Sequence, residues 1–267
     1  MLVKEKKINN YLININNVND IESLKKVGVT TFSFALKNYS VGYEKTYSVE
    51  EINGITEDKY VLINKVLDTK EIEELKKFIN NMDVKGFIFE DVGLINVINN
   101  SYEKILFINH FNCNSLSINN FLKYVNSVVV SNELTFEEYK NILSKVNKEV
   151  VLNVFGYNQV MYSKRKLLSN YNDHFNQEHT YKNSIKDKYG NVEFNIIEQD
   201  DSTVILSKKI FDGRRLLELN NVKYFYINSS YIDVSVIIDF INGNIIDNSD
   251  EGFLDKKSYY KVKGEKI

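Results

Sequence analysis

The sequence predicts an α/β domain folded as a (β/α)8 TIM-like barrel, with a hairpin-containing insertion between strands 7 and 8. The first observation is that short β-rich runs alternate with stretches of helical spacing along the chain. The second is that about eight such units fit into 267 residues, close to the roughly 250 residues typical of this barrel. A composition of 43% hydrophobic and 26% charged residues is that of an ordinary globular protein.

Eight runs are expected to form the barrel strands. Most of them are continuously apolar rather than alternating, which is typical of parallel strands buried on both faces. They are YLININ at 11–16, TTFSFAL at 30–36, YVLINKV at 60–66, GFIFED at 86–91, KILFINH at 104–110, SVVVSNEL at 127–134, VVLNVFG at 150–156 and VKYFYIN at 222–228.

Helical segments lie between these runs. The clearest is 69–82, which Asp68 is expected to cap while Glu71 completes a capping box. Thr135 and Glu138 repeat this arrangement at the start of 135–146. Segments 115–125 and 233–241 are expected to be connecting helices too. Strands separated by helices indicate right-handed βαβ units, and an open doubly wound sheet without a G-x-G-x-x-G motif is the alternative.

The repeat is interrupted once, by an insertion at about 157–220. Its runs VEFNIIE and STVILS are expected to pair as a hairpin over the barrel. The C-terminal tail at 251–267 is basic and aromatic, and we expect it to pack along the surface. No low-complexity linker divides the chain, so residues 1–267 are interpreted as a single domain.

Composition restricts the classes of partner. A net charge of −2 and a pI near 6.0 do not favour a non-specific nucleic-acid binder, and no DNA partner is expected. The N-terminus lacks the features of a signal peptide, and no apolar run approaches the length of a membrane helix. The single cysteine, Cys113, fits a reducing compartment. We therefore expect a cytoplasmic protein with no membrane partner.

In such a barrel the active site lies at the carboxyl ends of the strands. Polar residues follow the apolar runs at Asn64 and Lys65, Glu90 and Asp91, Asn109 and His110, Ser131 and Glu133, Gly156 and Asn228. From these we select Lys65, Asp91, His110 and Glu133 as ligand-binding candidates. The alternative for Asp91 and Glu133 is a capping role at the next helix, and for Lys65 it is a solvated side chain.

No motif for a metal or a nucleophile is present in the sequence. His174 and His179 are five residues apart rather than the four of a zincin helix, so no metal site is predicted. Cys113 follows His110 closely, but the sequence implies no third partner for catalysis. A buried, inert thiol is the expected state of Cys113.

The segment VFGYNQVMYSKRKLLSNY at 154–171 resembles the signature region of the peptidase U32 family, in which a strand and a glycine precede M-x-Y-S-x-R and L-L-S-x-Y. The matching residues are Gly156, Tyr162, Ser163, Arg165, Leu168, Ser169 and Tyr171. Segments at 87–94, 108–115, 128–139 and 252–263 are similar to further family segments in the same order. The resemblance implies a barrel and adds Tyr162, Ser163 and Arg165 to the ligand-binding candidates.

The chain departs from this signature at several positions. Val151 and Asn153 stand where the family has Glu and Phe, and Lys164 stands in place of a glycine. Gln159 and Lys166 stand where the family has cysteines. Family members similar to RNA and quinone hydroxylases hold an iron–sulfur cluster with four cysteines, which one cysteine cannot assemble. The cofactor prediction is therefore none.

Three functions follow as hypotheses. The preferred one is a cluster-free U32-like protein acting in RNA modification, namely tRNA uridine hydroxylation. In this reading tRNA and a cysteine-containing U32 relative are its partners, and the chain is an accessory subunit. The alternatives are a U32 peptidase or other hydrolase, and a non-catalytic barrel scaffold. Convergence of Lys65, Asp91, Glu133 and Arg165 on one pocket would argue against the scaffold.

Overall fold

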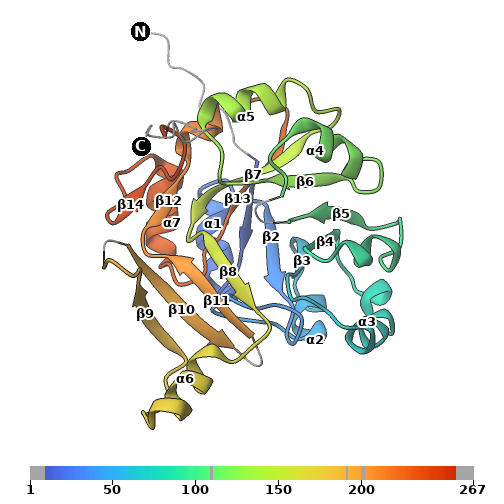
Figure 1. Ribbon diagram of the computed structural model, residues 1–267. Coiled ribbons are helices and arrows are strands. Elements are labelled where there is room, and N and C mark those ends of the chain that lie inside the picture. Colours follow the sequence, from blue (N-terminus) through green and yellow to red (C-terminus); the bar gives the residue numbers. More distant parts are fainter. Residues whose placement is uncertain (1–9, 109–110, 191, 200–201, 257–267) are drawn as a thin grey trace, which may run out of the picture.

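The computed structural model describes residues 10–108, 111–190, 192–199 and 202–256. Its centre is a closed barrel of eight parallel strands (Figure 1), closed because β13 pairs with both β7 and β1. The strands are β1 (Tyr11–Asn14), β2 (Thr31–Ala35), β3 (Asp58–Ile63), β4 (Gly86–Phe89), β5 (Glu103–Leu106), β6 (Ser127–Val130), β7 (Val150–Gly156) and β13 (Val222–Ile227). The predicted barrel and its eight strands are confirmed.

Helices connect the strands around the outside of the barrel. The α-helices here are α1 (Ile21–Lys26), α2 (Val49–Asn53), α3 (Thr69–Lys76), α4 (Ser115–Phe121), α5 (Phe136–Leu143) and α7 (Val234–Asn242). Short 3-10 helices are η1 (Val18–Asp20), η2 (Ile79–Asn81), η3 (Val92–Asn96) and η4 (Arg214–Glu218). Among the described residues, none of the helices has the length and apolar character needed to cross a membrane.

Both predicted capping boxes are present. Asp68 accepts a hydrogen bond from Glu71 N at 2.8 Å, and Thr135 Oγ1 accepts one from Glu138 N at 3.3 Å. Helix α3 ends at Lys76, earlier than predicted, because the next two amides bond to carbonyls three residues back, the tighter pattern of a 3-10 turn.

The core has two layers. A smaller cluster fills the inside of the barrel and includes Leu12, Leu62, Ile88, Ile105, Val129 and Val151. A larger cluster lies between the strands and the outer helices. Because side chains alternate along a strand, every barrel strand contributes to both layers. This explains why the strands are continuously apolar in sequence.

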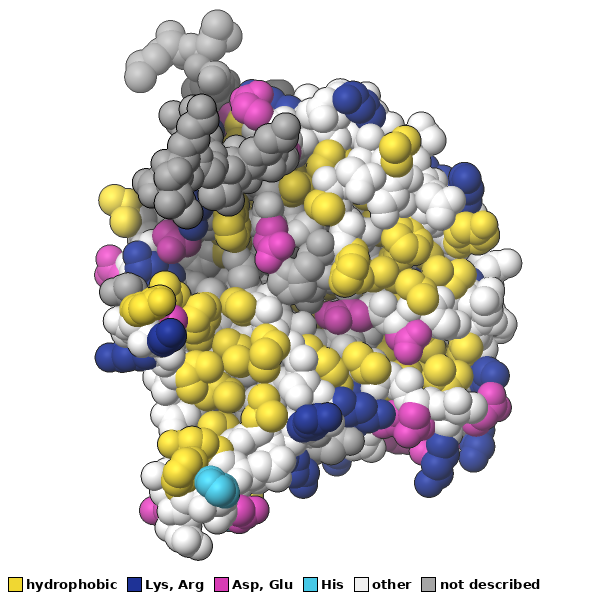
Figure 2. Space-filling model, viewed as in Figure 1, with side chains coloured by type: hydrophobic (Ala, Val, Ile, Leu, Met, Phe, Trp, Pro, Cys, Tyr) yellow, Lys and Arg dark blue, Asp and Glu magenta, His cyan; other side chains and the backbone are white. Residues whose placement is uncertain are grey.

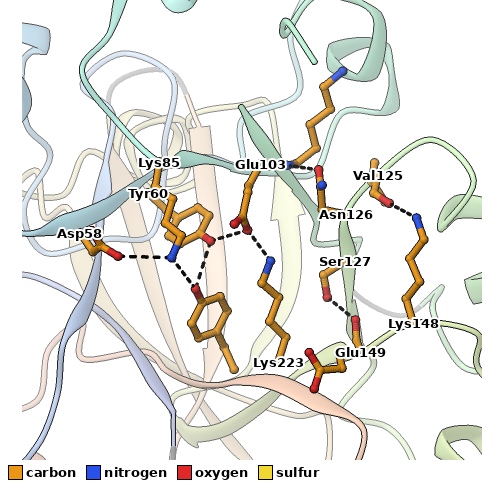
Figure 3. Close-up of polar contacts among 12 residues, drawn as sticks. Asp58, Tyr60, Lys85, Glu103, Val125, Asn126, Ser127, Lys148, Glu149 and Lys223 are labelled. Atoms are coloured by element: carbon orange, nitrogen blue, oxygen red, sulfur yellow. Dashed lines mark hydrogen bonds and ion pairs between the residues drawn. The ribbon is translucent and has the colours of Figure 1, made fainter. Parts of the chain in front are cut away.

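A polar network fills the amino-terminal end of the barrel (Figure 3). Tyr60 Oη donates to Glu103 Oε2 at 2.7 Å, and Lys223 Nζ forms an ion pair with the same carboxylate. Lys85 Nζ donates to Tyr224 Oη at 3.1 Å and to Asp58 Oδ2 at 3.3 Å. These contacts come from β3, β5 and β13 and from Lys85 just before β4, so they hold one end of the barrel together.

The insertion forms a four-stranded antiparallel sheet beside the opposite end of the barrel, in the order β8-β11-β10-β9 (Figure 1). Its elements are β8 (Gln159–Ser163), α6 (Leu167–Phe175), β9 (Lys182–Lys186), β10 (Glu193–Gln199) and β11 (Ser202–Ser207). The predicted hairpin is β10–β11, and β8 and β9 extend it on both sides. Strand β12 (Ile210–Asp212) then returns to pair with β7, and β14 (Ser249–Asp250) pairs with β12.

Candidate functional site

A cavity of about 370 Å³ lies at the carboxyl ends of the barrel strands, between the strands and the four-stranded sheet. We call it the mouth cavity. Its walls include Glu90 after β4, Asn153 on β7, Tyr226 on β13, Tyr43 from the loop after β2, and Tyr157 before β8. Figure 2 shows hydrophobic side chains gathered on both sides of the hollow and acidic side chains between them.

Glu90 is the acidic residue of the mouth cavity whose pKa is shifted strongly by burial. It directly follows β4, and its backbone N–H donates to the carbonyl of Ile63 at 3.1 Å, which continues the parallel pairing with β3. Burial raises the pKa of Glu90 to about 8. Near neutral pH the side chain is therefore mostly a protonated acid, which can donate one hydrogen bond and accept others.

Three asparagines form a second part of the wall. Asn158 Oδ1 accepts hydrogen bonds from Asn132 Nδ2 at 2.6 Å and from Asn153 Nδ2 at 3.5 Å. Asn158 is held in turn by Ser207 Oγ, which accepts from its backbone N–H at 3.0 Å. The amide groups are thus fixed by one another, and their remaining hydrogen-bonding atoms are available to a ligand.

The buried polar atoms of the mouth cavity are not all satisfied by hydrogen bonds among the described residues. One without such a bond is Asn153 Oδ1 on β7, while the hydroxyls of Tyr226, Ser33 and Tyr43 lie within reach of one another. Burial also raises the pKa of Tyr43, as do its neighbours Tyr226 and Glu90, so its hydroxyl stays protonated. Unpaired buried polar groups are costly, and a bound polar ligand would satisfy them.

Comparison with known proteins identifies the family. The model of peptidase family U32 matches residues 27–219, which is more than half of the chain. The chain belongs to this family. In the solved structure of the U32 peptidase Mk0906, 96% of the chain aligns with 86% of this one at 12% identity and a TM-score of 0.52. At that identity the likeness shows the shared fold.

Two further solved structures align more loosely with this U32 member. The Bacillus cereus spore cortex-lytic enzyme SleL matches at 10% identity and a TM-score of 0.42, with 91% of this chain and 76% of that one aligned. A chitinase from Chromobacterium violaceum matches at 8% identity and a TM-score of 0.39, with coverages of 91% and 96%. No curated protein matches the chain.

The predicted site residues occupy different places in this U32 fold. Glu133 lines the mouth cavity. Lys65, Asp91 and Tyr162 line an adjoining groove, which shares Glu90 with the mouth cavity. Ser163 and Arg165 line neither of these two spaces, and His110 lies outside the described residues. Lys65, Asp91, Glu133 and Arg165 therefore do not converge on one pocket, so this criterion does not exclude the scaffold alternative, and the ligand-binding role of the candidates stays a prediction.

Several of these residues have structural contacts of their own. Lys65 is buried and forms an ion pair with Glu71 at 3.5 Å. Asp91 accepts a hydrogen bond from Gly93 N at 2.8 Å, the N-cap contact of η3. Tyr162 Oη lies 3.2 Å from Ser202 Oγ, joining β8 to β11. The capping alternative raised for Asp91 is therefore present in the structure.

Two signature residues of the family also have structural roles. Gly156 has a φ of +124°, and a Cβ there would lie 2.3 Å from the carbonyl oxygen of Asn228, so only glycine fits between β7 and β13. Ser169 lies in the first turn of α6, where its N–H and hydroxyl both donate to Glu198. These two residues therefore help to hold the start of the insertion in place, Gly156 at the end of β7 and Ser169 in the first turn of α6.

The residues present do not fit an iron–sulfur cluster. Gln159 and Lys166 replace the signature cysteines, and neither side chain is a ligand of such clusters. Cys113, the single cysteine, is exposed in the loop before α4, so the expectation of a buried thiol is wrong. Within the described part of the chain, no group of three His, Cys, Asp or Glu residues could hold a metal ion.

Sequence reasoning placed Glu90 among the strand-end residues but selected its neighbour Asp91. The choice depends on which of two adjacent carboxylates points into the barrel. Ile88 belongs to the inner core cluster and Phe89 to the outer one, so the alternation assigns Glu90 to the inside. Tyr43 gave no signal of this kind, because it lies in a loop whose course the sequence does not specify.

Proposed function

We propose that this chain acts in RNA modification and binds one uridine-like nucleotide with its base in the mouth cavity. The observation that carries the proposal is a protonated Glu90 beside fixed asparagine amides in a cavity of about 370 Å³. Enzymes that modify a base receive it in a pocket, where they read its edge with hydrogen bonds and hold its faces with aromatic rings. The mouth cavity offers both kinds of contact.

The hydrogen-bonding groups complement a uracil edge. That edge presents an N–H donor between two carbonyl acceptors. Asn153 Oδ1, which is buried and without a described partner, can accept from the N–H. The protonated Glu90 and the hydroxyl of Tyr226 can donate to the carbonyls. Phe107 and Tyr226 pack edge to face at 5.8 Å, which provides an aromatic wall beside them.

The charges of the cavity favour a neutral group over a phosphate. The carboxylates of Glu133 and Asp250 line it beside the protonated Glu90, and Lys256 is the one lysine among its lining residues. Carboxylates repel an anion in a partly buried space. A neutral base would therefore enter the cavity while the phosphates of the chain remain outside.

Hydroxylation of uridine also needs redox chemistry. Inserting an oxygen atom oxidises the base, and electrons must pass to an acceptor that the lone Cys113 does not provide. We infer that a cysteine-containing U32 relative supplies this chemistry and that the present chain serves as the accessory, base-binding subunit. Membership of the U32 family supports this pairing, because a relative that retains the cysteines would share the barrel fold.

Uridine binding measured against pH tests the base-binding role. Calorimetric titration from about pH 6 to about pH 9 should show affinity falling through the pKa of Glu90, near 8, as the donor is lost. The side chain in E90Q keeps a donor at every pH, so the part of the pH dependence that comes from Glu90 should be absent from this variant. Any pH dependence that remains in E90Q measures ionisation of uridine itself. E137Q, which changes an exposed glutamate on α5, should behave as the wild type. Equal pH profiles in all three proteins would overturn the proposal.

A cellular experiment tests the tRNA role. Mass spectrometry of tRNA nucleosides from cells with and without the gene should show loss of a hydroxylated uridine on deletion. The tagged protein should also recover a cysteine-containing U32 relative. An unchanged nucleoside profile would exclude the tRNA form of the proposal.

Hydrolysis is the second candidate, favoured by the presence of Glu90 and Glu133 in one cavity. A carboxylic acid with a pKa near the working pH is suited to general acid–base catalysis, and the family takes its name from peptidases. Incubation with a peptide library should then give products that disappear in E90Q. Absence of cleavage by the wild type would exclude this candidate for peptides.

A further inference from the structure

A second cavity of about 400 Å³ adjoins the mouth cavity. Tyr157 and Leu206 line both, so they form the shared wall. We call the second space the side cavity. It lies between the inner face of the four-stranded sheet and Tyr231, which is in the loop between β13 and α7. A ligand larger than one base could therefore occupy both spaces.

The register of the sheet decides which side chains face the side cavity. Ser184 on β9 is opposite Asn195 on β10, and Asn195 is opposite Leu206 on β11. Residues opposite one another share a face, and Lys182 lies two positions from Ser184, so it shares that face too. A cation, a hydroxyl, an amide and an apolar side chain thus form one wall.

Tyr231 forms the facing wall. Its φ of +64° is unusual for a residue with a bulky side chain, and its N–H donates to Glu44 Oε2 at 3.0 Å, which holds it there. Lys182 Nζ lies 4.4 Å from the centre of the Tyr231 ring. The Tyr231 hydroxyl is buried and has no hydrogen-bond partner among the described residues. The ring and the cation are thus held together at one side of the cavity.

The two cavities differ in charge. The mouth cavity is lined by the carboxylates of Glu133 and Asp250, by Lys256 and by the protonated Glu90, whereas the side cavity has Lys182 and no carboxylate among its lining residues. Lys182 makes no ion pair with the described residues, so its charge is available to an anion. Lys208 Nζ also donates to Ser184 Oγ at 3.1 Å, but its charge is paired with Glu193 at 3.2 Å, so Lys182 supplies the uncompensated charge. One space suits a neutral group and the other suits an anion next to an aromatic ring.

We propose that the side cavity is the subsite for the neighbouring nucleotide of a single-stranded RNA, with Lys182 and Ser184 at its phosphate and Tyr231 at its base. The proposal rests on the proposed function, because it extends the ligand whose first base occupies the mouth cavity. Single-strand binding sites combine a cation along the backbone with aromatic rings for the bases. Tyr157, which lines both cavities, would lie between the two bases.

The test compares uridine with the dinucleotide uridylyl-uridine in equilibrium titrations. The wild type should bind the dinucleotide more tightly than the nucleoside. K182Q should weaken the dinucleotide roughly tenfold, the usual range for losing a hydrogen bond to a charged group, and leave uridine unchanged. In K182Q the slope of log affinity against log salt concentration for the dinucleotide should also decrease, by the contribution of about one phosphate contact.

K188Q is the matched control. Lys188 is exposed, lies 5.5 Å from the ring of Tyr189, and lines neither cavity. K188Q removes the same charge from a similar contact with an aromatic ring, so this variant should bind both ligands as the wild type does. Y231L should weaken the dinucleotide alone, because it removes the ring but keeps an apolar side chain.

The outcomes separate the two proposals. Uridine binding that depends on Glu90, together with equal dinucleotide affinity in K182Q and K188Q, would overturn the side-cavity subsite and leave the proposed function standing. If neither ligand binds the wild type, both proposals fail. The subsite is supported if the wild type binds the dinucleotide more tightly than uridine, if K182Q and Y231L reduce this gain, and if K188Q does not.

Discussion

Gln199 on β10 and Tyr43 in the loop after β2 are joined by a hydrogen bond of 2.7 Å from the Gln199 side-chain amide to the Tyr43 carbonyl. The same side chain accepts from Gly42 N at 2.7 Å. The end of one insertion strand is thus fixed to a barrel loop more than 150 residues earlier in the chain. Because Tyr43 lines the mouth cavity, this contact connects the position of the four-stranded sheet to the shape of the site.

Q199A should therefore loosen the mouth cavity. It leaves a backbone N–H and a carbonyl without their partners, which costs about 1–3 kcal/mol. Hydrogen exchange should show faster exchange of the Gly42 amide, and uridine binding should weaken. Q177A changes a glutamine that is exposed after α6 and serves as the control. Protection of Gly42 equal to that in the wild type would contradict the role assigned to Gln199.

E90Q should change stability with pH in a defined direction. Burial raises the pKa of Glu90 from its ordinary value to about 8, so the folded protein binds this proton more tightly than the unfolded chain. The contribution of Glu90 is fully present below its ordinary pKa and is lost as pH rises to 8. E90Q stays neutral, so its unfolding free energy should exceed that of the wild type by an amount that grows over this range and then levels off.

The expected gain for E90Q is on the order of 2 kcal/mol above pH 8, well below the full value of the pKa shift because Glu90 is only partly buried and solvent reduces the cost. Urea unfolding at several pH values measures it, with E137Q as the control. A difference that shrinks as pH rises would show that Glu90 is charged in the folded protein at neutral pH.

The sequence predicted the barrel more fully than the site. Apolar runs such as GFIFED and VVLNVFG identify strands because burial on both faces leaves a local composition signal. The site depends on contacts between distant segments, such as the one between Gln199 and Tyr43, and these leave no local pattern. Glu90 could be found once alternation was applied to β4. Lys182 and Tyr231 come together because the pairing of β9 with β10 puts Lys182 on the sheet face that meets the loop after β13, and polar, exposed residues do not specify that register.

E198A should destabilise the insertion. Glu198 is buried on β10, and its carboxylate accepts from the backbone N–H groups of Leu168 at 2.8 Å and Ser169 at 3.1 Å, in the first turn of α6. Alanine would leave both N–H groups unsatisfied, at a cost of about 1–3 kcal/mol. Amide exchange in α6 should accelerate more than in the barrel strands.

The control for E198A is E178A, which removes an exposed carboxylate just after α6. If the helix were held to the sheet by apolar contacts alone, both variants would leave amide exchange in α6 unchanged, and the capping role of Glu198 would be disproved.

Y60F should lower stability without changing ligand binding. Tyr60 belongs to the polar network at the amino-terminal end of the barrel, where its hydroxyl donates to Glu103 and lies 3.3 Å from Tyr224 Oη (Figure 3). Its loss leaves a partly buried carboxylate with one fewer donor, at a cost of about 1–2 kcal/mol. Chemical unfolding measures this cost. Y102F removes a hydroxyl that donates to two backbone carbonyls outside the network, so it controls for the loss of a bonded phenol hydroxyl.

The pH dependence of this network is opposite to that of Glu90. Burial raises the pKa of Glu103, but the hydrogen bonds from Lys223 and Tyr60 and the charges of Lys223 and Lys85 outweigh it, so the pKa is lowered. The stability from Glu103 is present above its ordinary pKa and is lost as pH falls through the lowered value. Y60F should therefore lose less stability than the wild type on acidification, while uridine titrations of the two proteins at neutral pH agree. Weakened uridine binding in Y60F would mean that the two ends of the barrel are coupled.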